Sequence, residues 1–170
     1  KNAQGGWVVT CAGTDGAKVR ALTVIDAAGR KAWRRPRRKR WGVPALGIWG
    51  VFKATLPRSL HIEAMADGWL WAAPIGASRS SVVFVTAADL TCADPPRRPD
   101  ALLLDRLRRS ALLRDLSASQ FERSVVVCDA TPSVCMGDVS SGLILAGEAS
   151  LTLDPLSGSG VEHAIRSGIQ

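Results

Sequence analysis

The sequence has 170 residues, of which 46% are hydrophobic and 22% are charged. This length and composition exclude an intrinsically disordered chain and fit one folded domain or slightly more. The formal net charge of +7 arises in one segment, 30–40, in which every charged residue is Lys or Arg. Because the rest of the chain is close to neutral, the charge does not indicate an extended basic face.

Hydropathy and cysteine content narrow the class of protein further. The most apolar segment, 143–156, contains Glu148 and Asp154 and is shorter than the roughly 18 residues that cross a bilayer, so we expect no membrane contact. The four cysteines form no C-x-x-C pair, which favours a reduced, cytoplasmic protein without a metal site. The chain opens on Lys1 without an initiator Met, so we expect it to be part of a longer protein.

Strand-forming residues dominate the first half of the chain. Segments 6–12 and 18–26 flank a turn that contains Gly13 and Gly16, and they predict a β-hairpin. Further Val-, Ile- and Trp-rich segments, separated by turn residues, predict an antiparallel sheet over 46–54, 60–65, 69–75 and 81–87.

Helical and strand segments alternate in the second half. Apolar residues at helical spacing predict one or two amphipathic helices over 99–116. Strands are expected at 124–128 and 143–147, and a helix at 160–167. The fold class is therefore expected to be mixed α/β.

The segment from Gly147 to Ala164 carries the most chemistry. A buried strand ends in Gly147, and an acid, an Asp-Pro bend, a Ser/Gly loop and a helix start follow. The acid can accept hydrogen bonds from a polyol, and the helix N-terminus attracts negative charge. An ordinary strand-loop-helix connection explains the same pattern.

This segment closely resembles the second FAD-binding motif of flavoproteins with the glutathione-reductase-type fold, G-D-A-A-x-x-x-D-P-x-x-x-x-G. The resemblance implies that Glu148, in the place of the usual Asp, holds the ribityl chain of FAD and that the following loop faces the N1 and C2 carbonyl edge of the flavin. The FAD contacts implied here are Gly147, Glu148, Asp154, Pro155, Leu156, Ser157, Gly158, Ser159 and Gly160.

An upstream segment is similar to another motif of the same family. Residues 25–30 read I-D-A-A-G-R and resemble the strand that ends in D-A-x-G-R beside the dinucleotide. This resemblance adds Asp26, Gly29 and Arg30 to the implied FAD contacts.

A third match concerns residues 67–75, which resemble the W-x-W-x-I-P signature of flavin-dependent halogenases and their monooxygenase relatives. The resemblance implies that Trp69 and Trp71 form a wall between the flavin and the organic substrate. The alternative is a strand whose two tryptophans pack into a core on one face.

Two departures from the halogenase pattern bear on the reaction. Ser157 stands where tryptophan halogenases carry a Glu, and Ala73 replaces the Ile of the signature. With Trp69, Trp71 and Ser157 as the catalytic candidates, we expect hydroxylation of a small aromatic molecule or a Trp-containing peptide. Halogenation is the alternative, and the need for a separate flavin reductase is open.

The resemblance also implies the domain organisation. Residues 1–35 and 126–170 are expected to belong to a FAD/NAD(P)-binding three-layer fold, with an antiparallel substrate domain at 36–125 inserted between them. The G-x-G-x-x-G turn of that fold is absent from the sequence, so the chain by itself is expected to hold FAD poorly and to be inactive.

The basic segment 30–40 supports an alternative from another class. Trp33 lies within it, Trp41 and Trp49 follow it, and Trp and Arg together stack on single-stranded nucleic acid. A basic module that binds nucleic acid or another partner is this alternative. We favour a loop that meets a phosphate or an acidic partner, and expect its arginines, Arg38 included, to leave flavin spectra unchanged when replaced.

Overall fold

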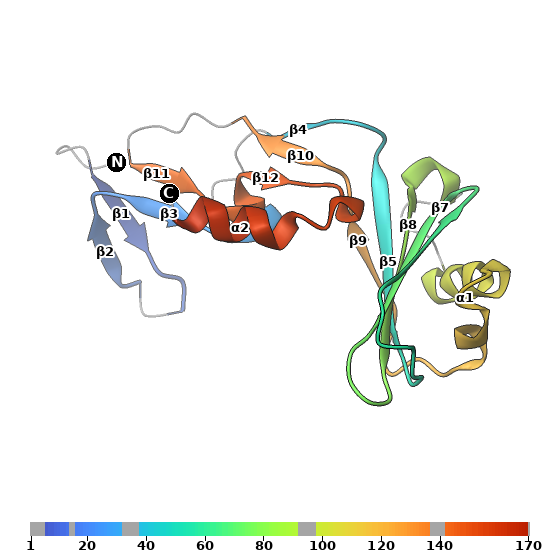
Figure 1. Cartoon of the computed structure of the whole chain (residues 1–170). Helices are drawn as coiled ribbons and strands as arrows, with labels where there is room; N and C mark the ends of the chain where they lie inside the picture. Colours follow the sequence, from blue (N-terminus) through green and yellow to red (C-terminus); the bar gives the residue numbers. More distant parts are fainter. Residues whose placement is uncertain (1–5, 14–15, 32–37, 92–97, 137–141, 170) are drawn as a thin grey trace. The chain divides into compact units, whose positions relative to one another are not determined.

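The computed structural model describes residues 6–13, 16–31, 38–91, 98–136 and 142–169. The chain divides into two compact units, unit 1 with residues 1–41 and 132–170 and unit 2 with residues 42–131. The elements are strands with two α-helices and several short 3-10 helices, which confirms the predicted mixed α/β class (Figure 1). No helix among the described residues is long and apolar enough to cross a membrane.

The predicted hairpin forms at the start of unit 1, but its second arm is shorter than expected. β1 (Trp7–Thr10) pairs antiparallel with β2 (Lys18–Ala21). The chain then leaves the hairpin, and β3 (Val24–Asp26) pairs in parallel with β11 (Leu143–Leu145). This parallel pairing needs a glycine at position 142, because a Cβ there would lie only 2.5 Å from the carbonyl oxygen of Leu22.

Unit 1 contains a third small sheet, which the sequence did not predict. β4 (Arg38–Arg40), β10 (Ser133–Cys135) and β12 (Leu151–Thr152) pair antiparallel in the order β12-β10-β4. The strands are two or three residues long, so they are too short to show the two-residue alternation that identifies a strand. The helix α2 (Gly160–Ile169) follows them and confirms the predicted final helix.

Unit 2 is built on the predicted antiparallel sheet. Its strand order is β6-β7-β8-β5-β9. The strands are β5 (Ala45–Phe52), β6 (His61–Met65), β7 (Gly68–Pro74), β8 (Ser80–Ala87) and β9 (Val126–Asp129).

One face of this sheet packs against the helix α1 (Pro99–Arg109), which lies beside the strands in Figure 1. Leu103 and Leu107 of α1 are fully buried against Ile48, Phe84 and other apolar side chains of that face. Each such side chain contributes about 1.5–3 kcal/mol when it is fully buried. Unit 2 therefore has an apolar core of its own.

The helical region ends earlier than the predicted limit at residue 116. α1 stops at Arg109, and the 3-10 helix η3 (Arg114–Ala118) follows it. The carboxylate of Glu63 on β6 accepts hydrogen bonds from the Ser110 hydroxyl, from Ala111 N at 2.7 Å and from Leu112 N at 3.1 Å. These bonds hold the chain in a non-helical turn directly after α1.

The unit limits follow from strand pairing. β4 belongs to unit 1 because Lys39 pairs with Val134 of β10, and β9 belongs to unit 2 because Val127 pairs with Ile48 of β5. The predicted domain limits after residues 35 and 125 each lie a few residues before the observed unit limits.

Candidate functional site

The carboxyl ends of the parallel strands β3 and β11 bring two of the predicted motifs together. Asp26 is opposite Leu145 in the register, and Ala146 N donates to Asp26 O at 3.0 Å. Beyond this pair, Arg30 Nε lies 3.8 Å from Glu148 Oε2. Ligands of open α/β sheets bind at such carboxyl ends.

Asp26 and Gly29 shape the turn that follows β3. Asp26 is buried, and its Oδ1 accepts a hydrogen bond of 2.9 Å from Ala28 N. Gly29 has a φ of +70°, in the left-handed region that favours glycine, and begins the 3-10 helix η1 (Gly29–Lys31). A Cβ at Gly29 would lie 4.0 Å from Glu148 Oε2, so the turn runs close to the Glu148 carboxylate.

The corresponding turn after β11 is the 3-10 helix η4 (Gly147–Ala149). Gly147 has a φ of +58°, and its N–H donates to Ser167 Oγ on α2 at 2.8 Å. A Cβ at Gly147 would lie 3.4 Å from the Cβ of Ala164, so α2 packs against the turn at this position. Gly147 thus serves both the turn and the position of α2.

The side chain of Glu148 points into solvent beside Arg30. The exposed fractions of the two side chains are 53% for Glu148 and 25% for Arg30. An ion pair this exposed stabilises a fold by at most about 1 kcal/mol. The carboxylate of Glu148 therefore stays exposed to solvent and can accept hydrogen bonds from a ligand.

The loop before α2 is preorganised by its own hydrogen bonds. Asp154 caps the 3-10 helix η5 (Pro155–Ser157), with Oδ1 accepting from Leu156 N at 2.8 Å. Ser157 Oγ accepts from Ser159 N at 3.3 Å. These side chains of Asp154 and Ser157 are thus engaged in the loop itself.

The same loop leaves open space at two glycines. Gly158 has a φ of +63°, and a Cβ at Gly158 or Gly160 would meet no atom of the described residues within 4 Å. Gly160 begins α2, whose first N–H groups lack intrahelical partners and carry the positive end of the helix dipole. The loop can therefore receive a flat or negatively charged group at close range.

His163 is held in the fold on the inner side of α2. Its Nε2 lies 3.3 Å from Ser150 Oγ, and Ser150 Oγ donates to Gly147 O at 2.8 Å. Because the Ser150 hydroxyl has a single proton, His163 Nε2 donates to it. This contact holds the His163 imidazole against the turn after β11.

Trp69 and Trp71 lie in unit 2 on the sheet face opposite α1. Their neighbours Leu70 and Ala72 are fully buried on the α1 side, whereas both tryptophans are half-buried. The tryptophans share one face as expected, but they do not form part of the core beneath α1.

Trp49 on β5 joins the same face, which the sequence analysis missed. Trp71 and Trp49 are both paired with Val83 of β8, one on each side, and Trp49 Nε1 donates to Ser81 Oγ at 2.8 Å. The two-residue period of a strand was the available signal, because it places Trp49 on the face opposite the buried Ile48.

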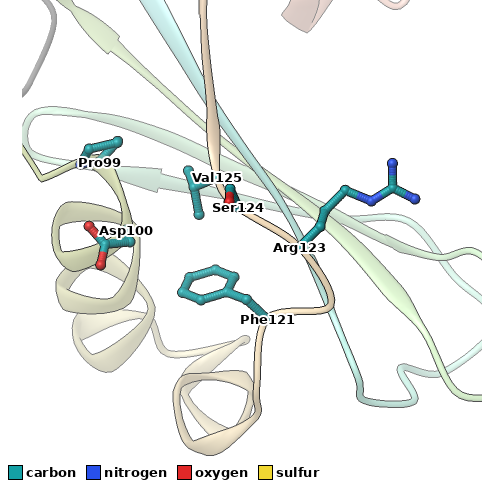
Figure 2. A pocket seen from close by; sticks show the side chains of 6 residues that line it. All are labelled: Pro99, Asp100, Phe121, Arg123, Ser124 and Val125. Atoms are coloured by element: carbon teal, nitrogen blue, oxygen red, sulfur yellow. The ribbon is translucent and has the colours of Figure 1, made fainter.

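A cavity of about 390 Å³ lies at the start of α1, and none of the predicted site residues lines it. Pro99, Asp100, Phe121, Arg123, Ser124 and Val125 line it. Figure 2 shows Phe121 extending toward α1 and Arg123 extending away from it. A hydrogen bond from the backbone N–H of Ala101 to the Asp100 carboxylate is the main reason that the pKa of Asp100 lies below its ordinary value. The sequence contained no signal for this cavity.

The basic segment is described only in part. Residues 32–37, with Trp33 and Arg37, lie outside the described residues. Arg38 is turned into unit 1, where its guanidinium bonds to the turn at Glu148, contrary to the expectation of a surface contact. Within the described ranges, no three His, Cys, Asp or Glu side chains gather as a metal site.

No family model and no curated protein matches the sequence. Solved structures do match in fold. One is CmlS, a flavin-dependent halogenase, with a TM-score of 0.86, 22% identity, and coverage of 98% of this chain and 32% of CmlS. Another is the peptidyl tryptophan dihydroxylase QhpG, with a TM-score of 0.74, 24% identity, and coverage of 96% and 39%.

A third match is a flavoprotein/dehydrogenase from Cytophaga hutchinsonii, with a TM-score of 0.79, 18% identity, and coverage of 99% of this chain and 44% of that one. The chain thus spans between about a third and under a half of these structures. The resemblance found in the sequence is confirmed at the level of fold. The chain has the fold of a segment shared by flavin-dependent halogenases and related flavoproteins.

Proposed function

We propose that the protein to which this chain belongs is a FAD-dependent oxidoreductase that hydroxylates an aromatic substrate with dioxygen. The observation that carries this proposal is the meeting of two motifs at the ends of β3 and β11, with Arg30 Nε 3.8 Å from Glu148 Oε2. Bound FAD would supply the oxygen chemistry, because amino-acid side chains do not perform it themselves.

The residues of unit 1 fit such a cofactor. The exposed carboxylate of Glu148 is suited to accept hydrogen bonds from the ribityl hydroxyls. The open space at Gly158 and Gly160 is suited to the flavin edge, with the start of α2 stabilising negative charge there. The capped loop supplies these groups without further ordering.

The FAD assignment is tested by cofactor occupancy of the complete protein. Glu148→Ala and Gly160→Leu should each lower FAD occupancy, the first by removing an acceptor and the second by filling open space. Glu162→Ala is the matched control, because Glu162 is exposed and its ion pair with Arg166 lies within the same helix. Wild-type occupancy in both site variants would refute the assignment.

Hydroxylation is proposed over halogenation because of Ser157. Its hydroxyl is neutral and is engaged by Ser159 N, so it cannot supply the carboxylate expected of a tryptophan halogenase. A Trp-containing peptide is a proposed substrate, supported by the match to QhpG, a peptidyl tryptophan dihydroxylase. A small aromatic molecule is the other proposed substrate class, and cytoplasm is the proposed compartment.

Halogenation is the second candidate, favoured by the high TM-score with the halogenase CmlS. The complete enzyme should be given reduced flavin, dioxygen, bromide, and either aromatic molecules or Trp-containing peptides. The proposal predicts a product heavier by oxygen. A brominated product without inserted oxygen would replace hydroxylation with halogenation.

Trp69 and Trp71 are proposed to line the wall between flavin and substrate. Their half-buried face in β7, continued by Trp49, supports this proposal. Trp71→Ala should lower the fraction of consumed dioxygen that appears in product while FAD affinity stays within about twofold of wild type. Measuring oxygen use and product together checks this, and an unchanged coupling ratio would argue against the role.

A further inference from the structure

The guanidinium of Arg38 joins three separate parts of unit 1. One terminal nitrogen donates to Ser133 Oγ at 3.2 Å and to Thr152 Oγ1 at 3.4 Å. The other donates to the carbonyl oxygens of Glu148 at 2.5 Å and Ala149 at 3.0 Å. Ser133 and Thr152 are buried, so the guanidinium is anchored on one side by fixed groups.

Arg38 binds the carbonyl oxygens of Glu148 and Ala149, which accept none of the hydrogen bonds described within the turn. Ala149 N donates to Ala146 O, and Ser150 N donates to Gly147 O. Ser150 O is taken by Cys135 N at 2.8 Å. Arg38 therefore completes the hydrogen bonding of a turn whose carbonyls would otherwise depend on solvent.

The geometry of these bonds requires arginine. A planar guanidinium offers its donors in a fixed fork, and here the fork spans two side-chain acceptors and two backbone acceptors. A lysine ammonium is a compact charge on a flexible stem and cannot hold both pairs of acceptors at once.

We propose that Arg38 is a positioning residue for cofactor binding, which acts by fixing the backbone at Glu148 so that its carboxylate is presented beside Arg30. This inference rests on the proposed function, because it assigns the purpose of the fixed turn to FAD. The inference applies to Arg38 and not to Lys39, which is the next residue of β4 and is exposed.

Amide hydrogen exchange of the complete protein without FAD tests the positioning directly. Arg38→Gln should raise exchange in segment 146–151 by about tenfold, since the carbonyl contacts that order the turn are lost. Lys39→Gln is the matched control and should leave that segment unchanged. Unchanged exchange in Arg38→Gln would overturn the inference whatever the cofactor.

A double-mutant cycle on FAD affinity tests the link to Glu148. Arg38→Gln should raise the FAD dissociation constant about tenfold in the wild-type background but less than about twofold in a Glu148→Gln background. Equal effects in both backgrounds would show a general structural role and overturn the inference.

Two further outcomes are decisive. Arg38→Lys keeps the charge and replaces Arg38→Gln in these experiments if the glutamine variant does not fold. Wild-type amide exchange in segment 146–151 together with wild-type FAD affinity in Arg38→Lys would overturn the geometric role. If the wild type binds no FAD while Arg38→Gln still raises exchange at 146–151, the proposed function fails and the ordering of the turn by Arg38 stands.

Discussion

The two units of the chain are held together in different ways. Unit 2 buries a continuous set of apolar side chains between α1 and one face of a five-stranded sheet. In unit 1 the strands are short, and the paired residues Ile25 and Ile144 of β3 and β11 remain 65% and 45% exposed. Polar contacts, such as those of Asp26 and Arg38, order unit 1 instead.

This difference is consistent with the separate roles proposed for the two units. A self-contained apolar core gives unit 2 a rigid sheet on which to present Trp69 and Trp71. In unit 1, hydrogen-bonded turns place polar groups at the strand ends, which is what a cofactor requires.

The largest expected loss of stability comes from a substitution in the apolar core of unit 2. Phe84→Ala should lower the free energy of unfolding by about 3–5 kcal/mol, because it removes a fully buried ring. Ile144→Ala in this chain should change it by less than about 0.5 kcal/mol, because that side chain is exposed. Urea unfolding measures both, and equal losses would contradict the difference between the units.

An intermediate effect is expected in the turn after β11. Gly147→Ala should cost about 1–2 kcal/mol, because Gly147 has a φ of +58°. Gly168→Ala in α2 is the matched control, since a Cβ there meets no atom of the described residues within 4 Å. It should stabilise the helix by up to about 1 kcal/mol. Thermal unfolding of both variants checks the contrast.

The smallest effect is a pH dependence in unit 2. Burial by itself raises the pKa of Glu63, but hydrogen bonds from Ser110, Ala111 and Leu112 outweigh it and leave the pKa below its ordinary value of 4.5. A carboxyl with a lowered folded-state pKa adds stability above its unfolded value and loses it as the pH falls through the folded value.

Glu63→Gln should therefore reduce stability at pH 7 by about 1 kcal/mol and flatten its decline below pH 4.5. Urea unfolding between pH 3 and pH 7 measures this. Glu162→Gln, an exposed residue of α2, is the control. An identical pH profile for Glu63→Gln and wild type would exclude the contribution of Glu63.

Long elements and motif residues were predictable from the sequence, whereas pairings between distant short segments were not. The strands β5, β7 and β8 were predictable because each spans seven or eight residues rich in β-branched, aromatic and other apolar side chains, and turn residues separate them. The parallel pairing of β3 with β11 depends on two three-residue segments far apart in the chain.

The candidate site shows the same division. Glu148 and Arg30 stood out because their motifs resemble known ones, and the structure brings them together. Arg38 looked like one charge among many in a basic segment, since its inward direction depends on β10 and β12. Glu63 likewise carried no local signal, because its hydrogen-bond donors come from residues 110–112.

The most direct test of the central claim is amide hydrogen exchange of the complete protein with and without FAD. We expect FAD to protect segments 26–30 and 147–160 together, because the proposed site joins the ends of β3 and β11 with the loop before α2. Protection confined to the cavity lined by Pro99 and Phe121, or no protection at the two strand ends, would contradict it.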